Sequence, residues 1–416
     1  MADKYILARR DVELFPIQQD KEQFIVIKDA IGLVEEGKVL SLDLYWIMTL
    51  LDGTKSLRDI QMELMRNRGG VLVGMDELEE IIEQLDESFL LDTQRYREAK
   101  KQIENDFFAG KVRPCSHCGS SYPREALELK TMLDGIIESQ AVVSTAQGNL
   151  KALIAPHIDL SVGSDVYGSA YQQLKNTSPS RVIILGVGHC MTEGLFCLTE
   201  KDFQTPFGIV KNDRSAVKKL EQAGSHIISE NDFVHKAEHS VEFQVIFLQH
   251  LLAKDSFAII PILCGSLVGS LSEYSREAYR EAALPFLSVL SELLQEKDKE
   301  TIIVAGVDFS HTGLKFGHNM PASYLESQSK QHDKKLLNTL SKGDPDGFWE
   351  ESIGVKDKFN VCGFSAMACL LEILPPLAGK ILNYQIWRED PTQSAVSFAA
   401  VAFTAKQDVQ GVEKNA

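Results

Sequence analysis

From Leu150 onward, short apolar runs of strand length alternate with segments of helical pattern. Such alternation is typical of a parallel or mixed β-sheet with helices on both faces. We therefore predict an α/β fold with a mixed sheet flanked by helices for this part of the chain. The predicted strands are Ala152–Ala155, Arg181–Leu185, Ala258–Leu263 and Thr301–Ala305.

The first hundred or so residues follow a different pattern. Phe24–Ala30 predicts a strand, and Leu42–Leu51 predicts a short helix stopped by the turn pair Asp52–Gly53. Ser56 can cap a second helix, which we expect to end at Gly69–Gly70.

A third helix is predicted from an apolar stripe with helical spacing, made of Leu78, Ile81, Ile82, Leu85 and Phe89. We expect Leu90–Tyr96 to follow it as a wing-like strand, so that the order of elements is that of a winged helix. The charged run Arg95–Lys101 predicts a solvated helix that leads out of this domain. The predicted domains are therefore residues 1–110, small and winged-helix-like, and residues 111–416, which contain the α/β sheet.

The composition, 44% hydrophobic and 25% charged, is that of a soluble globular chain rather than a disordered or fibrous one. The formal net charge is −16, and residues 1–110 alone hold 14 Lys and Arg against 23 Asp and Glu. Acidic proteins repel phosphate backbones and anionic lipids, so we expect no nucleic-acid or membrane partner. For the small domain, peptide or protein binding is favoured over DNA binding, beside the alternative that it only packs against its neighbour.

The longest uncharged stretch, Ser256–Ser272, contains Pro261, Gly265 and Gly269 and predicts a buried strand and loop rather than a membrane span. Seven cysteines spread over a long chain favour reduced thiols over a disulfide framework. The first twenty residues are mixed and polar, unlike a signal peptide. We therefore expect a cytoplasmic protein, with any cysteine chemistry being metal binding or nucleophilic.

Histidines follow three of the predicted strands. His157, His189 and His311 each come shortly after a strand, and Asp308 precedes His311 in the same segment. In an open α/β sheet, ligands bind beyond the carboxyl ends of the strands. One such histidine would be taken as a satisfied polar residue, but three of ten in equivalent places are expected to face one crevice.

Two further segments offer reactive side chains. Cys362 precedes Gly363 and an apolar helix, whose N-terminal dipole end is expected to favour the thiolate. His239 lies in the first turn of a predicted amphipathic helix, three residues before Glu242. Two interpretations of this turn stay open: His239 belongs to the site, or the turn is acidic only because negative charges suit the N-terminal end of the helix dipole.

The remaining cysteines are assigned from their surroundings in the sequence. Cys264 and Cys369 lie in apolar runs and are expected in the core, whereas Cys190, beside a histidine, fits either a core or a site role. Cys115 and Cys118 form a lone C-x-x-C pair, where we do not expect structural zinc because no second pair accompanies it.

Several separated blocks between Lys111 and Lys406 resemble, in order and spacing, the Memo-like family, known in bacteria as protein B of the AmmeMemoRadiSam system. The blocks are RPCSHCGSSYP, LIAPHIDLSVGSDVYGSAY, VIILGVGHC, EHSVEFQVIFL, AGVDFSHTG, VCGFSAM and YQIWREDPTQSAVSFAAVAF. The family's fold resembles that of the class III extradiol dioxygenases, with a pocket at strand ends. Within residues 1–110, Leu42–Leu91 resembles the PqqD-like domains, which hold peptide or protein substrates for partner enzymes.

The resemblance implies a metal held by His157, His189 and Cys362. Two imidazoles and one anionic ligand leave open positions on the metal, as in non-haem iron(II) sites, and a thiolate in place of a carboxylate softens the site. The expected cofactor is therefore iron(II), with copper or zinc as alternatives. Ile158–Leu160 and Cys190 depart from common family patterns, so the substrate, a small molecule or a peptide, is left open.

The resemblance also implies that His311 moves a proton, with Asp308 orienting it and His239 as a further pocket residue. The implied function is a non-haem metal-dependent oxidoreductase related to the class III extradiol dioxygenases. Two alternatives stay open: a metal-free thiol enzyme with Cys362 as nucleophile and His157 or His311 as base, and a non-catalytic binding protein with a dioxygenase-like pocket. The family name suggests a radical S-adenosylmethionine enzyme as partner.

Overall fold

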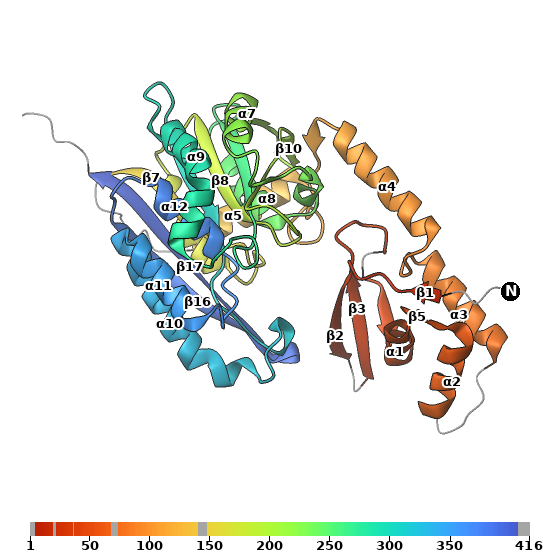
Figure 1. The fold of residues 1–416 in the computed structure, drawn as a ribbon. Coiled ribbons are helices and arrows are strands. Elements are labelled where there is room, and N and C mark those ends of the chain that lie inside the picture. Colours follow the sequence, from red (N-terminus) through yellow and green to blue (C-terminus); the bar gives the residue numbers. More distant parts are fainter. Residues whose placement is uncertain (1–4, 20–21, 36, 68–73, 140–147, 407–416) are drawn as a thin grey trace, which may run out of the picture. The chain divides into compact units, whose positions relative to one another are not determined.

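The computed structural model describes residues 5–19, 22–35, 37–67, 74–139 and 148–406, and the chain divides into two units (Figure 1). Unit 1 spans Met1–Ala109 and unit 2 spans Gly110–Ala416. Unit 1 has a hydrophobic core of its own, and unit 2 has two hydrophobic clusters.

Unit 1 combines two small antiparallel sheets, β2-β3-β4 and β1-β5, with helices α1 to α4. Its core buries Leu51, Ile60, Leu78 and Leu90 completely. The elements are β1 (Tyr5–Leu7), β2 (Glu13–Gln19), β3 (Glu22–Lys28), β4 (Val39–Ser41), α1 (Leu42–Leu50), β5 (Asp52–Ser56), α2 (Leu57–Asn67), α3 (Met75–Glu87) and α4 (Gln94–Ala109).

The predicted first strand and first two helices of this unit are confirmed as β3, α1 and α2. Asp52–Gly53, predicted as a turn, instead opens strand β5, which pairs antiparallel with β1. Gly53 has a φ of 81°, so the backbone bends sharply there while the segment stays in the sheet. The predicted end of the second helix at Gly69–Gly70 lies outside the described residues.

The prediction of a wing-like strand over Leu90–Tyr96 is wrong. Leu90 and Leu91 are buried in the core, and Leu91 forms an isolated bridge with Ala8 instead of a strand. After them Thr93 begins helix α4, because its carbonyl accepts the backbone N–H of Arg97 at 3.0 Å. The charged run therefore forms a helix, as predicted, but this helix starts earlier and takes the place of the closing strand.

Unit 2 is built on a twelve-stranded mixed sheet. All four predicted strands are confirmed, as β7 (Gly148–Ala155), β8 (Arg181–Val187), β13 (Ala258–Cys264) and β14 (Thr301–Gly306). They are parallel neighbours in the order β7-β14-β8-β13. The long strand β17 (Ser394–Lys406) runs antiparallel to β7 and makes the sheet mixed.

Both faces of the central strands are buried, because successive residues pack into different hydrophobic clusters. In β14, Ile303 and Ala305 belong to one cluster while Ile302 and Val304 belong to the other. The first cluster includes side chains of α7, α9 and α12, and the second includes side chains of α5, α6 and α8. Helices therefore cover both faces of the sheet, as predicted.

The other elements of unit 2 complete the sheet and its two helical layers. The helices are α5 (Ala126–Glu138), α6 (Ser164–Tyr171), α7 (Arg214–Ala223), α8 (His239–Leu251), α9 (Arg276–Gln295), α10 (Ala322–Lys342), α11 (Pro345–Val355) and α12 (Phe364–Ile373), with short 3₁₀ turns at Gln172–Leu174, Asp232–His235, Leu314–Phe316 and Asp390–Thr392. The remaining strands are β6 (Val112–Arg113), β9 (Phe196–Leu198), β10 (Asp202–Thr205), β11 (Gly208–Asn212), β12 (Ile228–Ser229), β15 (His311–Gly313) and β16 (Gly379–Glu389).

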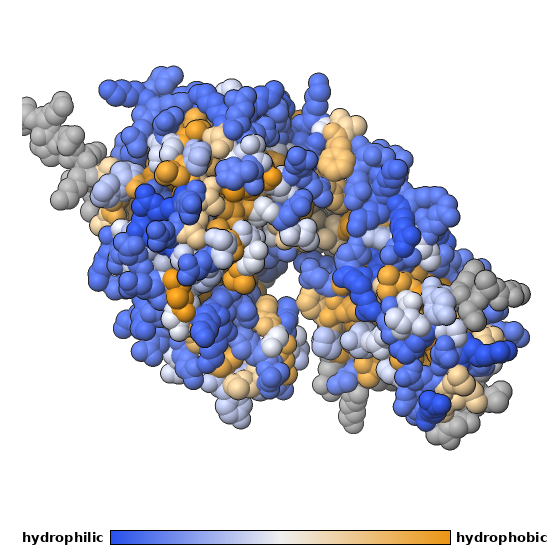
Figure 2. Space-filling view, viewed as in Figure 1, coloured by the Kyte–Doolittle hydropathy of each residue, from blue (hydrophilic) through white to orange (hydrophobic). Residues whose placement is uncertain are grey.

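Hydrophilic side chains dominate the face of the molecule shown in Figure 2, with apolar side chains scattered among them. Among the described residues, none of the helices has the length and apolar character that crossing a membrane requires. The predicted strand and loop at Ser256–Ser272 is confirmed as buried strand β13 and the segment that follows it.

Candidate metal centre

The candidate site lies at the carboxyl ends of three neighbouring strands. His157, Asp308 and His189 each stand two residues beyond the end of their strand, which is β7, β14 or β8 respectively. Since β14 pairs in parallel with both β7 and β8, the three strand ends meet at one edge of the sheet. His157 and Asp308 are buried, at 3% and 2% exposed, whereas His189 is exposed, so this edge is open to solvent on the His189 side.

Cys362 joins this edge from the start of helix α12. Its Sγ lies 3.4 Å from His157 Nε2 and 3.6 Å from the carbonyl oxygen of Asp308. Gly363 makes the approach possible, because a Cβ at this position would lie 2.4 Å from Val307 Cβ. Because glycine has no side chain, the segment that carries Cys362 can pack closely against Val307, the residue after β14.

Helix α8 brings two more polar side chains to the same edge. It packs directly on β14 at Gly306, where a Cβ would lie 2.4 Å from the carbonyl oxygen of Ser240. Glu238 is the N-cap of α8 and accepts the backbone N–H of Ser240 at 2.9 Å. The ring of His239 has its centroid 5.1 Å from that of His157 and 5.0 Å from that of His189, so three imidazoles form one cluster.

The donor atoms of His157, His189 and Cys362 all lie within 4.8 Å of one another. His157 Nδ1 donates to the carbonyl of Gly306 at 2.9 Å, and His189 Nδ1 lies 3.0 Å from a carboxylate oxygen of Glu238. Because Nδ1 of each ring has a partner, Nε2 is the nitrogen that would bind a metal, and metal-binding histidines are commonly oriented in this way. Two imidazole nitrogens and one sulfur fit iron(II), zinc or copper.

A second group of potential ligands shares His189 with the first. The donor atoms of His189, Glu238 and His239 also lie within 4.8 Å of one another. Glu238 Oε1 is 3.4 Å from His239 Nδ1. Because Glu238 already holds Nδ1 of His189, we assign it to orienting the ring rather than to binding the metal of the first group.

Burial sets the protonation of the centre. It lowers the pKa of His157 and lowers that of His239 well below the ordinary value, so both rings are neutral and able to bind a metal. Burial opposes ionisation of Glu238, but the adjacent His189 and the backbone N–H of Ser240 lower its pKa well below the ordinary value. An ionised carboxylate therefore stands behind a metal-facing imidazole.

The expectation that the helix end favours the Cys362 thiolate is not met. Burial raises the pKa of Cys362 well above its ordinary value, and the charge of Asp308 raises it further. The helix dipole acts only at close range, and here desolvation of the thiolate outweighs it. A bound cation would offset this penalty, because metals deprotonate the thiols that coordinate them.

His311 and Asp308 are in the same segment but are not hydrogen bonded as expected. The ring of His311 donates from Nδ1 to the carbonyl of Phe309 at 2.9 Å. Asp308 Oδ1 instead accepts the backbone N–H of His157 at 3.1 Å. Asp308 therefore positions His157, while a backbone carbonyl orients His311 and leaves its Nε2 free to take a proton.

Two residues next to the centre were not selected from the sequence. Glu238 directly precedes His239 and accepts from His189. His117, between Cys115 and Cys118, has its ring centroid 5.7 Å from that of His239. Their proximity results from how α8 packs on the sheet, and the only local signal was a carboxylate directly before His239.

The predicted core positions of Cys264 and Cys369 are confirmed, since both are buried, whereas Cys190 is exposed. The expectation of reduced thiols throughout is wrong at one place, because Cys115 and Cys118 are joined by a disulfide. A turn brings their Cα atoms to 5.9 Å, within the range that a disulfide spans.

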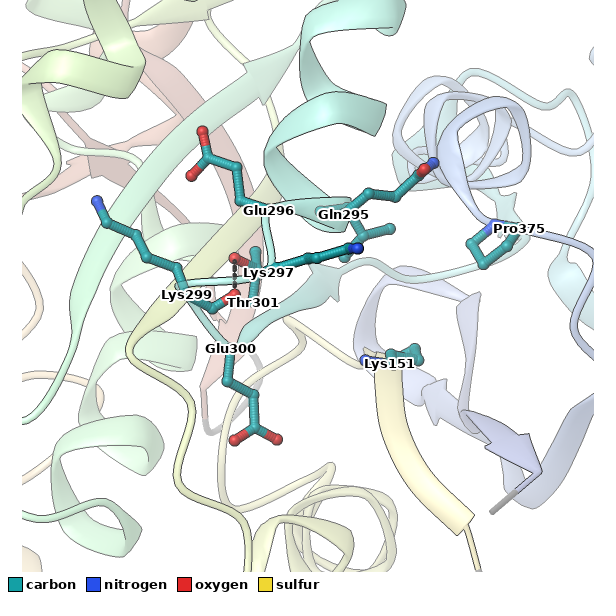
Figure 3. Close-up of a pocket in the computed structure, with 9 residues that line it drawn as sticks. Lys151, Gln295, Glu296, Lys297, Lys299, Glu300, Thr301 and Pro375 are labelled. Carbon is teal, nitrogen blue, oxygen red and sulfur yellow. Dashed lines mark hydrogen bonds between the residues drawn. The ribbon is translucent and has the colours of Figure 1, made fainter. Parts of the chain in front are cut away.

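A pocket elsewhere in unit 2 lies next to the first residues of β14 and does not include the histidines (Figure 3). Its charged side chains have both signs and are partly paired with neighbours. Glu296 accepts from Arg181 at 2.7 Å, and Lys299 donates to Asp213 at 3.0 Å. It lies at the amino end of β14, opposite to the carboxyl end that carries Asp308, so it is a separate surface feature.

Comparison with known proteins shows the family of the chain. The model of a family described as "Memo-like protein" matches residues 113–402. A MEMO1 family protein of Aquifex aeolicus is 30% identical over 94% of this chain and 99% of that protein, and one of Thermus thermophilus is 27% identical over 82% and 97%. Human protein MEMO1 is 26% identical over 70% of this chain and 97% of its own length. The chain therefore belongs to the Memo-like family.

Proposed function

We propose that the chain is a metal-dependent oxidoreductase with one metal held by His157, His189 and Cys362. The observation that carries the proposal is the convergence of the three donor atoms within 4.8 Å, each supplied by a different segment. Iron(II) is the expected metal, because two imidazoles and one anionic ligand leave coordination positions for substrate and oxidant. Copper and zinc are the alternatives that the thiolate admits.

When bound, the metal would supply redox or Lewis-acid chemistry at the carboxyl edge of the sheet. The side chains of the protein supply orientation and proton transfer. Glu238 and the Gly306 carbonyl fix the two imidazoles, and Asp308 holds the backbone of His157. The pKa of His311 is lowered to about 4 by burial, so its Nε2 is unprotonated near neutral pH and can accept a proton.

The thiol-enzyme alternative is disfavoured by the surroundings of Cys362. A nucleophilic cysteine needs a lowered pKa, but burial raises the pKa of this thiol. The adjacent His157 offers little compensation, since burial lowers its pKa and keeps it neutral. A neutral thiol beside a neutral imidazole suits a metal site better than covalent catalysis.

Metal analysis of protein purified without chelators tests the proposal. We expect about one equivalent of metal in the wild type and its loss in His157→Ala, His189→Ala and Cys362→Ser. His226→Ala is the matched control, because this exposed histidine bonds only to a carbonyl, that of Ala282, at 3.0 Å. A protein that takes up no metal but loses activity on alkylation of Cys362 would contradict the proposal.

The relation to the class III extradiol dioxygenases and the role of unit 1 stay predictions. Leu42–Leu91 resembles the PqqD-like domains, so we propose peptide binding for unit 1 and a radical S-adenosylmethionine enzyme as the partner that uses the peptide. The acidic composition of residues 1–110 favours a basic peptide. Co-elution of the full chain with such an enzyme only when the peptide is present would support this role, and partnership without the peptide would contradict it.

A further inference from the structure

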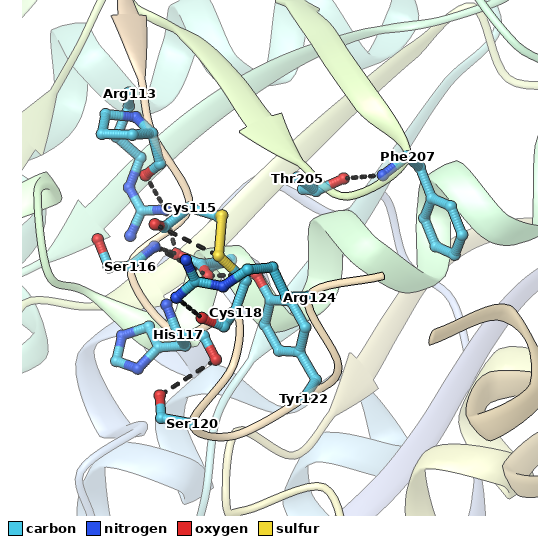
Figure 4. Close-up of a disulfide and its surroundings, with 12 residues drawn as sticks. Arg113, Cys115, Ser116, His117, Cys118, Ser120, Tyr122, Arg124, Thr205 and Phe207 are labelled. Carbon is cyan, nitrogen blue, oxygen red and sulfur yellow. Dashed lines mark hydrogen bonds and ion pairs between the residues drawn. A yellow bond between two sulfur atoms is a disulfide. The ribbon is translucent and has the colours of Figure 1, made fainter. Parts of the chain in front are cut away.

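The disulfide of unit 2 has no part in the proposed metal chemistry. Cys115 and Cys118 follow strand β6 and enclose only Ser116 and His117 (Figure 4). Both cysteines are half-buried rather than enclosed in the hydrophobic core. Cys197, Cys264, Cys362 and Cys369 keep free thiols, and therefore the chain is not a general disulfide scaffold.

The loop between the two cysteines is anchored without the disulfide. The backbone N–H groups of Ser116 and His117 donate to the carboxylate of Glu242 at 3.0 Å and 2.9 Å. Glu242 is fully buried, and Arg113 and Tyr122 also bond to it. A disulfide that closes so short a loop restrains the unfolded chain less than one that closes a long loop. Both facts indicate that stabilising the fold is a minor role of this bond.

The loop also lies against the histidine cluster. Nε2 of His117 donates to the carbonyl of Ala237 at 3.0 Å, directly before the N-cap of α8. The centroid of its ring is 5.7 Å from that of His239, and the His239 centroid is in turn 5.0 Å from that of His189. A change in the backbone between the cysteines therefore reaches the centre through two ring contacts.

We propose that Cys115 and Cys118 form a redox-active pair that exchanges electrons with an external dithiol, and that the state of the pair alters the packing of His117 on His239. The proposal is independent of the metal, because it needs only the loop, α8 and the dithiol. It assigns a second reactive site to the chain, with a protein or small-molecule dithiol as its reactant.

The exchange balances in two steps. A thiolate of the dithiol attacks one sulfur of the pair, a mixed disulfide forms, and the other sulfur leaves with the bonding electrons and takes a proton from water. The second thiol of the reactant then attacks the mixed disulfide and releases the remaining cysteine as a thiol. The pair gains two electrons and two protons, and the dithiol becomes a disulfide.

Thiol trapping on metal-free, folded, full-length protein tests the exchange. The protein is incubated with a twofold excess of reduced thioredoxin, then alkylated, and the peptide that contains both cysteines is weighed by mass spectrometry. We expect at least tenfold more doubly alkylated peptide than without thioredoxin, and loss of this labelling when an excess of oxidised thioredoxin is added before alkylation. Labelling that requires urea would overturn the proposal, because it would make the bond purely structural.

Histidine ring resonances in the same samples test the contact with the centre. Reduction is expected to shift the signals of His117 and His239, while exposed His226 serves as the unshifted reference. Cys190→Ser should respond as the wild type does, and Cys115→Ala/Cys118→Ala should not respond to thioredoxin. Reversible reduction with an unmoved His239 signal would contradict the coupling of the pair to the centre. Because no metal is present, neither result depends on the proposed oxidoreductase activity.

Discussion

Replacing Glu238 by glutamine tests how the centre is held. The carboxylate lies 3.0 Å from His189 Nδ1 and also accepts the backbone N–H groups of His189 and Ser240, at 3.3 Å and 2.9 Å. Glutamine keeps the shape of the side chain but removes the charge and turns one acceptor into a donor. His189 Nδ1 would then face at best a neutral amide oxygen in place of the charged carboxylate, so the ring would be held less firmly with Nε2 toward the metal.

The expected loss of metal affinity follows from the position of Glu238, which is hydrogen bonded to the proposed metal ligand His189 but does not bind the metal itself. Removing such a partner usually lowers metal affinity by about 10- to 100-fold, which corresponds to about 1.4–2.7 kcal/mol. Glu238 is 5% exposed, so water cannot easily replace the lost interaction. We therefore expect Glu238→Gln to fall within this range rather than below it.

Competition between the protein and a chromogenic chelator for zinc measures the change, because zinc has no redox chemistry of its own. Glu351→Gln is the matched control. Glu351 lies 3.1 Å from Nδ1 of His332, so the same kind of pair is removed outside the candidate centre. The control should change zinc affinity less than twofold. Equal affinity in Glu238→Gln and wild type, or an equal loss in both variants, would refute the role of Glu238.

Three further predictions concern stability. Burial lowers the pKa of His235 from its ordinary 6.5 to about 3, so between these pH values the unfolded chain binds a proton that the folded chain does not, and stability falls as the pH falls. His235→Asn should reduce that slope by about 1.4 kcal/mol per pH unit in urea unfolding at pH 4.5 to 6, and an unchanged slope would contradict the assignment. Gly363→Ala places a Cβ 2.4 Å from Val307 Cβ and should cost about 1–3 kcal/mol, seen as a lower Tm together with weaker metal binding. Arg9 and Asp29 form an ion pair at 2.7 Å, and their side chains are 0% and 1% exposed. Asp29→Asn removes the negative charge of this buried pair and should lower the free energy of unfolding by about 3–5 kcal/mol. Hydrogen exchange should then rise in unit 1 and stay unchanged in unit 2.

The fold of unit 2 could largely be predicted from the sequence, because its central strands are apolar runs buried on both faces. Their order could not. Neighbouring strands β7 and β14 are separated by almost 150 residues, and no local pattern encodes which strands pair. In unit 1 the prediction failed at Leu90–Tyr96, where two buried leucines before a helix start have the same apolar character as a short strand.

The residues of the candidate centre that follow strands could be predicted from the sequence, whereas the residues that depend on helix packing could not. Histidines after strands share one edge in any parallel sheet, so His157 and His189 could be paired from the sequence. The roles of Glu238 and His117 depend on how closely α8 approaches the sheet at Gly306, which is a property of the packed structure. The pKa of Cys362 likewise depends on burial by distant segments. The helix dipole alone predicts a lowered pKa, but burial raises it.

X-ray absorption at the metal edge of protein loaded with one equivalent of zinc examines the ligand set itself. We predict one sulfur scatterer at about 2.3 Å and nitrogen scatterers at about 2.0–2.1 Å, with the sulfur lost in Cys362→Ser and a nitrogen lost in His157→Ala. A wild-type spectrum of oxygen and nitrogen alone, unchanged by both substitutions, would show that the metal binds elsewhere and that His157, His189 and Cys362 do not hold it.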